Sequence, residues 1–197
     1  MLTIKINQIK NDDLFQIINY LLDEKIIAYP TDTIYGLGCI ATSQKAIDKI
    51  YAIKKRKKDK PLLVLVKSYC MLKKYFFVSA KQDKLLRTLW IRGKAPTTVI
   101  LKQRGLLANN LAPDNFGVAV RMPINNSFVI NLIKKINLPI IATSLNISGE
   151  SPIEKINQID DEMSKKIDLA VDAGLLDKKS STLIDIQDIN NIITLRK

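Results

Sequence analysis

The chain has 197 residues, 47% of them hydrophobic, which predicts one folded domain spanning residues 1–197 and excludes a disordered chain. Its net charge is 31 − 19 = +12, which favours anionic partners. No histidine is present, which excludes Ser-His-Asp and Cys-His nucleophilic sites, HExxH zinc sites and imidazole general bases.

The positive net charge has two explanations. An AT-rich genome raises the lysine content with no functional cause, whereas the scarcer arginines offer planar forks that match phosphate and carboxylate oxygens. The two cysteines, Cys39 and Cys70, are too few for a disulfide scaffold. No apolar run is long enough to span a membrane, and residues 1–10 lack a signal-peptide core. We therefore expect a cytoplasmic protein with no membrane partner.

Hydrophobic periodicity predicts strands and helices that alternate without a long linker. In chain order we expect a strand at 2–6; a helix capped by Asn11 or Asp12, with Leu14, Ile17, Ile18, Leu21 and Leu22 inward; a strand at 26–29; a helix capped by Ser43; a strand at 62–66; and helices near 71–75 and 83–90. Strands follow at 97–101 and 117–121, a helix at 127–136, a buried strand at 139–143, a helix at 153–165, and strands at 169–171, 182–185 and 192–195. This order predicts the α/β class: a single domain with a twisted, open, mixed sheet flanked by helices.

Polar residues follow two of the buried strands. Thr31, Asp32 and Thr33 precede a glycine-containing turn at 35–38, and the stretch from Thr143 to Asn146 precedes Ser148 and Gly149. Both are typical of turns closed by local hydrogen bonds, and both are equally typical of hydroxyl and amide groups that face a small ligand. The residues alone leave the two interpretations open.

Cationic residues also cluster near predicted strand ends. The segment from Lys54 to Lys60 holds six positive charges and one negative charge, and Arg121 closes a strand. A solvated helix end and a surface ion pair are the simple interpretations. A phosphate site is the alternative, because α/β proteins bind ligands at strand ends. Since GxxxxGK[ST] and GxGxxG are both missing, neither a P-loop nor a Rossmann site is supported.

These segments together resemble the YrdC-like (TsaC) family of L-threonylcarbamoyladenylate synthases. The matching blocks are PTDTIYGLG at 30–38, KxR at 54–56, KPL at 60–62, VAVRMP at 118–123, TSLNISG at 143–149 and STLID at 181–185, with a terminal Arg196. KxR followed by Ser144 and Asn146 is the specific part. Of the family's PGPxT segment, only Pro96 and Thr98 match.

The resemblance implies an enzyme that forms threonylcarbamoyl-AMP and pyrophosphate from L-threonine, bicarbonate and ATP, with Mg²⁺ carried by the phosphates. The product would serve tRNA modification, with tRNA and the downstream threonylcarbamoyl-transfer complex as further partners. Adenylation by positioning and charge neutralisation needs no histidine.

By the same resemblance, each matching residue receives an expected role. Lys54 and Arg56 are the catalytic groups; threonine is held by Thr33, Tyr35, Lys60, Thr98 and Ser181; the nucleotide is held by Lys54, Arg56, Arg121, Ser144, Asn146 and Arg196; no protein side chain binds a metal. Lys55, Lys57 and Lys58 are expected to be solvated.

Two other functions remain open. Basic charge also suits a tRNA or double-stranded RNA binding module without catalysis, although the sequence has no RNP-type stacking motif. A carbamoyl-transfer domain like that of hydrogenase maturation proteins is the third reading, but the zinc-finger and acylphosphatase segments of those larger proteins are missing here.

Overall fold

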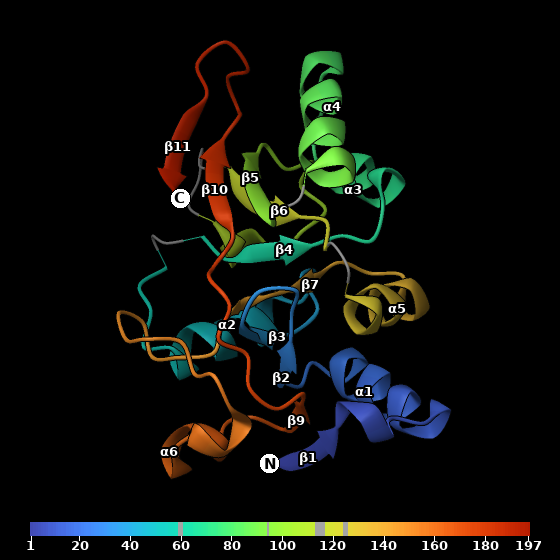
Figure 1. The fold of residues 1–197 in the computed structure, drawn as a ribbon, viewed down its shortest axis with the longest axis vertical. Coiled ribbons are helices and arrows are strands. Elements are labelled where there is room, and N and C mark those ends of the chain that lie inside the picture. The colour runs from blue at the N-terminus through green and yellow to red at the C-terminus, as the bar shows by residue number, and fades with distance from the viewer. Residues whose placement is uncertain (59–60, 94, 113–116, 124–125) are drawn as a thin grey trace.

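The computed structural model describes residues 1–58, 61–93, 95–112, 117–123 and 126–197. It confirms the α/β class, with open mixed sheets flanked by helices. The strands are divided between two sheets, which occupy the lower and upper halves of the molecule in Figure 1.

The first sheet has the order β1-β9-β2-β3-β8. Its strands are β1 (Leu2–Lys5), β9 (Leu169–Asp172), β2 (Ile27–Pro30), β3 (Tyr35–Gly38) and β8 (Thr143–Ser144). β9 lies parallel to both β1 and β2, whereas β3 is antiparallel to β2 and to β8. β2 and β3 are buried along their whole length, so this hairpin belongs to the core. The sequence predicted β2 but interpreted the β3 segment as a turn.

The second sheet has the order β11-β10-β5-β6-β4-β7. Its strands are β11 (Ile193–Arg196), β10 (Thr182–Asp185), β5 (Thr97–Leu101), β6 (Val118–Arg121), β4 (Leu63–Leu65) and β7 (Ile140–Ile141). Two pairs are parallel, β5 with β10 and β4 with β6, and the other neighbours are antiparallel.

The chain crosses from one sheet to the other within a few residues. The predicted buried strand at 139–143 is in fact two strands, because Ile140 pairs with Leu65 of the second sheet and Thr143 pairs with Leu37 of the first. Residues 139–143 are all buried and continuous in sequence, so the sequence pattern could not distinguish one partner strand from two.

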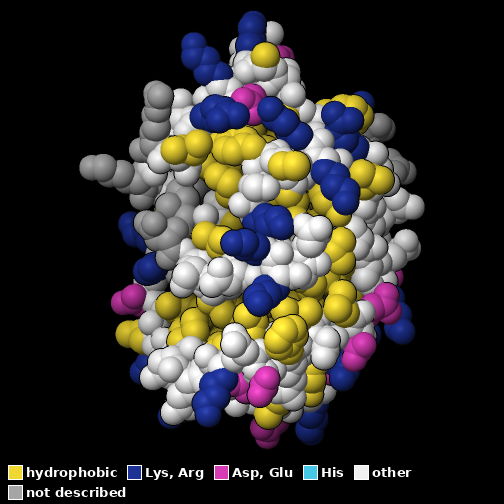
Figure 2. All heavy atoms as spheres, turned by 90° about the vertical axis from the view of Figure 1, so that its right-hand side faces the viewer, with side chains coloured by type: hydrophobic (Ala, Val, Ile, Leu, Met, Phe, Trp, Pro, Cys, Tyr) yellow, Lys and Arg dark blue, Asp and Glu magenta, His cyan; other side chains and the backbone are white. Residues whose placement is uncertain are grey.

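The helices are α1 (Asn11–Leu22), α2 (Gln44–Ile53), α3 (Tyr69–Tyr75), α4 (Ala80–Arg87), α5 (Ser127–Ile136) and α6 (Asp161–Ser164). A π-helical turn at Thr88–Arg92 follows α4, and 3-10 turns lie at Ile6–Gln8, Asn109–Leu111 and Ile156–Gln158. α3 and α4 lie beside the second sheet, and α1 and α5 lie on the same side of the molecule beside the first (Figure 1). On this face Lys and Arg side chains lie in separated groups among hydrophobic ones (Figure 2).

Side-chain caps explain where several helices begin. Ser43 caps α2 as expected, since its hydroxyl accepts a hydrogen bond from the Ala46 N–H at 3.1 Å. The expected cap of α1 is wrong: Asp13 accepts from the N–H of Lys10, at 2.8 Å.

Two helix predictions need correction. Leu22, expected to face inward, is 53% exposed. The helix expected at 153–165 is replaced by a 3-10 turn and the short α6. The reason is local, because the side chains of Gln158 and Asp160 accept backbone N–H groups and interrupt the helical ladder. Among the described residues, no helix is both long and apolar enough to cross a membrane.

Gly38 allows the two sheets to approach closely. The Tyr29 side chain crosses it and donates a hydrogen bond to the carbonyl of Ile141 at 2.7 Å. A Cβ atom on Gly38 would lie 2.3 Å from Cε1 of Tyr29 and 2.7 Å from the Ile141 carbonyl oxygen. Only glycine fits this contact without displacing the ring.

Gly38→Ala should therefore destabilise the protein, by about 1–3 kcal/mol, because the added methyl group overpacks the core. Gly36→Ala is the matched comparison, since its new Cβ would meet Thr31 Cγ2 at 3.3 Å and need only a small shift. Urea unfolding of both variants measures the effect. Equal free energies of unfolding for the two variants would contradict this account of Gly38.

Candidate active site between the two sheets

A pocket lies where the β2–β3 turn of the first sheet faces the second sheet. Residues from both sheets line it. Among them are many of the residues selected from the sequence: Thr33, Tyr35, Arg56, Thr98, Arg121, Ser144, Ser181 and Arg196. Lys60 lies outside the described residues.

Strand register brings distant residues together on the second-sheet wall. Arg196 of β11 pairs with Leu183, and Leu183 pairs with Thr98 of β5. The adjacent pair of Val99 with Val120 then places Thr98 beside the end of β6, where Arg121 lies. Segments nearly a hundred residues apart in sequence thus form one row across the sheet.

Positive charge dominates this pocket. Three of the chain's six arginines line it, namely Arg56, Arg121 and Arg196. Among the described lining residues none is an aspartate or glutamate. In the described part of the chain there is also no group of three or more His, Cys, Asp or Glu residues able to hold a metal ion. The pocket therefore suits an anion and offers no ready-made metal cage.

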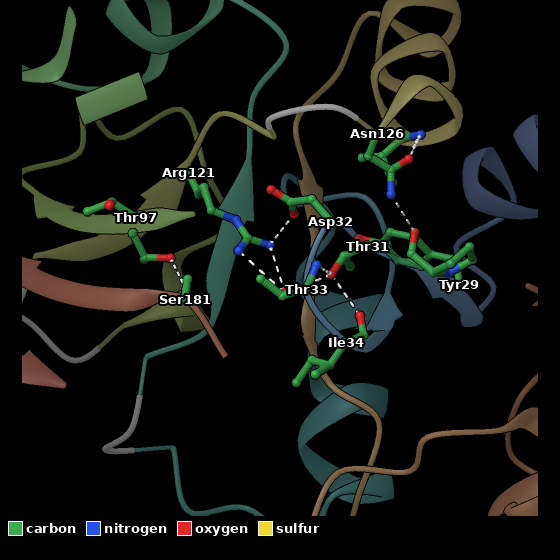
Figure 3. Close-up of polar contacts among 12 residues, drawn as sticks. Tyr29, Thr31, Asp32, Thr33, Ile34, Thr97, Arg121, Asn126 and Ser181 are labelled. Carbon is green, nitrogen blue, oxygen red and sulfur yellow. Dashed lines mark hydrogen bonds and ion pairs between the residues drawn. The ribbon is translucent and has the colours of Figure 1, made fainter. Parts of the chain in front are cut away.

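Arg121 is almost completely buried, although it lines the pocket. Its side chain pairs with Asp32 at 2.9 Å, and the exposed fractions of the two side chains are 2% and 4%. Its two terminal nitrogens also reach Thr33 Oγ1, at 3.4 and 3.5 Å (Figure 3). Burial lowers the pKa of Arg121, and the Asp32 carboxylate opposes that shift. The simple interpretation of Arg121 as a surface ion-pair former is therefore wrong.

The Thr31–Thr33 segment satisfies both interpretations made from the sequence. Thr31 Oγ1 donates to the Ile34 carbonyl at 2.7 Å and accepts from the Thr33 N–H at 3.1 Å, which closes a local turn. The two threonine hydroxyls are 2.9 Å apart, and both residues line the pocket.

A second hydroxyl cluster lies on the opposite wall. Thr98 and Ser181 are joined by a hydrogen bond of 2.8 Å between their hydroxyls. Arg196 donates from Nε to the Ser181 carbonyl at 3.0 Å and from a terminal nitrogen to the Ser181 hydroxyl at 3.4 Å. The three residues selected from the C-terminal side and from β5 therefore form one connected group.

Tyr35 reaches the pocket, but its hydroxyl is already bonded. The hydroxyl donates to the Gly174 carbonyl at 2.8 Å and accepts from the Ala173 N–H at 2.7 Å. Burial raises the pKa of Tyr35 to about 12. The hydroxyl therefore anchors the segment after β9, and the ring is the part of Tyr35 that faces a ligand.

Lys54 does not line the pocket, contrary to the expectation that it faces the phosphates. It is 0% exposed, and its ammonium donates to the Ser144 carbonyl, to the Asn146 carbonyl at 2.8 Å and to Asn146 Oδ1 at 2.7 Å. Asn146 is also absent from the lining and accepts a hydrogen bond from the Ser144 hydroxyl at 2.7 Å. The reason is geometric: Lys54 follows α2 directly, where the 144–148 loop packs and where its own carbonyl accepts the Ser148 N–H.

The other described residues of the cationic cluster differ in exposure. Arg56 is half-buried in the pocket wall and donates to the Pro61 carbonyl at 3.0 Å. Lys55, Lys57 and Lys58 are exposed. Asp32 lies beside the site and the sequence assigned it no role, although its position between two threonines after a buried strand was a usable signal.

Because Lys54 is buried, it should make the stability of the folded protein depend on pH in a direction that can be worked out. Burial lowers the pKa of Lys54 to about 7, whereas an unfolded lysine titrates near about 10.4. Between these values the unfolded chain binds a proton that the folded protein lacks, so the Lys54 contribution to stability rises with pH.

The free energy of unfolding of the wild type, relative to Lys54→Met, should therefore increase above about pH 7, by up to about 1.4 kcal/mol per pH unit. Denaturant unfolding of both proteins at several pH values measures it. The matched control is Lys55→Met, which replaces the neighbouring exposed lysine and is unfolded at the same pH values. A constant difference between wild type and Lys54→Met would show that Lys54 keeps an ordinary pKa.

Comparison with known proteins agrees with this architecture. The profile of the Sua5/yciO/yrdC family, described as telomere recombination, matches residues 19–197. A putative threonylcarbamoyl-AMP synthase of Methanocaldococcus jannaschii is 32% identical, over 98% of this chain and 91% of its own length. The threonylcarbamoyl-AMP synthase of Wigglesworthia glossinidia brevipalpis is 32% identical, over 85% of this chain and 86% of its own.

The fold is also similar to a solved structure, P. abyssi Sua5 complexed with L-threonine, with a TM-score of 0.86 and 26% identity. The match covers 99% of this chain but only 56% of the P. abyssi protein, so this chain corresponds to a little over half of that relative. With the profile matching most of the sequence and the relatives aligned along nearly all of it, the chain belongs to the Sua5/yciO/yrdC family.

Proposed function

We propose that this chain is a threonylcarbamoyl-AMP synthase, which forms threonylcarbamoyl-AMP and pyrophosphate from L-threonine, bicarbonate and ATP. The observation that carries the proposal is the pocket in which Arg56, Arg121 and Arg196 meet threonine and serine hydroxyls, with no carboxylate among the described lining residues. Such a pocket suits a triphosphate together with a small polar molecule. The relatives with this printed name align along most of the chain.

The reaction requires two bond-forming steps. The threonine nitrogen attacks the carbon of bicarbonate, and loss of water gives a carbamate. A carbamate oxygen then bonds to the α-phosphorus of ATP while the bond from that phosphorus to the bridging oxygen breaks and pyrophosphate leaves. Three anions must approach one another, so neutralising charge and holding the reactants in line are the main tasks of the protein.

The residues divide between the two substrates. Arg56, Arg121 and Ser144 contact the nucleotide, with Arg196 closing the site beside Ser181. Thr33, Thr98, Ser181 and the ring of Tyr35 surround threonine. Lys54 and Asn146 act from behind the wall, because their hydrogen bonds hold Ser144 and its loop. Lys60 remains a predicted threonine contact.

Mg²⁺ enters as part of the ATP substrate in this proposal. Because no described lining residue is a carboxylate, the phosphates and water supply its ligands. We further propose that the chain acts as one cytoplasmic domain. Its product serves tRNA modification, and tRNA and the threonylcarbamoyl-transfer complex are its partners.

Pyrophosphate release from ATP by the purified protein, with L-threonine or bicarbonate omitted in turn, tests the reaction. Release should require both, because the carbamate is the nucleophile toward ATP. Release that ignores threonine would refute the synthase assignment. Binding of tRNA that weakens steeply with salt, without any turnover, would instead favour an RNA-binding module.

Arg56→Ala should reduce kcat/KM for ATP by about 10²- to 10³-fold, the usual effect of removing one donor that stabilises charge in a transition state. Lys55→Ala is the matched control, because Lys55 is exposed and pairs with Glu162 at the surface, at 3.8 Å. Its kcat/KM should stay close to that of the wild type. If both variants behaved alike, Arg56 would not contact the reacting phosphates.

A further inference from the structure

Asp32 is a buried carboxylate to which the roles above give no task. It lies in the turn between β2 and β3 and is absent from the pocket lining, where its neighbours Thr31 and Thr33 are present. It pairs with Arg121 from behind the pocket wall, at 2.9 Å (Figure 3). Asp32 can therefore act on a ligand only through the groups that it holds.

The hydrogen bonds beyond Arg121 have a fixed direction. A hydroxyl has one proton, and Thr31 gives its proton to the Ile34 carbonyl, which can only accept. In the 2.9 Å contact between the two threonine hydroxyls, Thr33 must then be the donor. The Thr33 oxygen in turn accepts from the guanidinium of Arg121.

The direction of this chain determines what Thr33 offers to a ligand. Its proton is used on Thr31, and the two terminal nitrogens of the single Arg121 guanidinium, at 3.4 and 3.5 Å, share one of its lone pairs, which leaves the other lone pair. Thr33 lines the pocket, so this lone pair is available to an N–H or O–H group and not to a carboxylate or phosphate oxygen.

We propose that Asp32 is a positioning residue of the reaction: it holds Arg121 against Thr33, and the resulting chain makes Thr33 Oγ1 an acceptor for an N–H or O–H donor of the substrate. Naming that donor as the amino or hydroxyl group of L-threonine rests on the function proposed above. This chain of hydrogen bonds thus discriminates between the donor-bearing and the anionic parts of an amino acid.

The buried environment explains why a carboxylate is needed. Arg121 is 1% exposed, and its Nε–H has no hydrogen-bond partner among the described residues. A buried cation without a counter-charge turns toward any available anion. With Asp32 present, the guanidinium is held on the first-sheet side of the pocket. Without it, Arg121 is free to turn away from Thr33, and the hydroxyl loses its fixed direction.

Equilibrium binding of L-threonine to the full chain without ATP, measured by calorimetry, tests the proposal. Asp32→Asn keeps the shape of the side chain and removes its charge, and it should weaken threonine binding about tenfold or more. Asp83→Asn is the matched control, because it removes a carboxylate of α4 that pairs with Lys73 of α3 and Arg87 of α4, away from the pocket. It should leave threonine affinity within about twofold of the wild type.

A double-mutant cycle separates positioning from general loss of stability. If Asp32 acts through Thr33, then Asp32→Asn combined with Thr33→Val should bind threonine no more weakly than the weaker single variant. Independent structural damage would instead make the two losses add. Additive losses would overturn the proposal.

Two variants at Thr31 test the other end of this chain of hydrogen bonds and leave the Arg121–Asp32 ion pair intact. Thr31→Val removes the acceptor of the Thr33 proton and should weaken threonine binding, whereas Thr31→Ser keeps a hydroxyl and should restore it. If Asp32→Asn fails to fold, this pair decides: equal affinities for Thr31→Val and Thr31→Ser overturn the proposal.

Wild-type protein that binds no threonine at all would refute the proposed function. Wild-type binding with an unaffected Asp32→Asn would refute only the role of Asp32.

Discussion

The buried ion pair between Arg121 and Asp32 connects the two halves of this molecule. Arg121 ends β6 in the second sheet, and Asp32 lies in the β2–β3 turn of the first, so the pair spans the pocket wall that both sheets build. Removing water from both charges costs free energy that their attraction offsets only while each keeps its partner. The same ion pair therefore constrains both the relative position of the two sheets and the placement of Arg121.

The pocket gathers positive charge without a P-loop. Backbone amides of a glycine-rich loop are replaced by guanidinium groups from three separate segments, Arg56 before β4, Arg121 on β6 and Arg196 on β11. An arginine needs rigid support to present its fork, and strand register supplies it for the second and third. Lys54 holds the 144–148 loop from behind the wall through three acceptors.

Several hydroxyl groups in the pocket are hydrogen-bonded within the protein before any ligand arrives. Thr98 is bonded to Ser181, Ser144 to Asn146, and Thr31 to Thr33. Each bond consumes the single proton of one hydroxyl, and this limits what that group can offer a substrate. Preformed networks of this kind reduce the reorganisation needed on binding, which is the physical basis of a preorganised site.

The sequence by itself determined the α/β class, most strand and helix positions and many of the residues that line the pocket, because local periodicity and the YrdC-like blocks carry that information. It did not determine that Lys54 lies behind the wall, that the Tyr35 hydroxyl is bonded to the segment after β9, or that residues 139–143 divide between two sheets. Those features depend on which distant segments pack together. A buried apolar run or a charged side chain has the same local pattern whichever partner it meets, so only the tertiary structure could decide them.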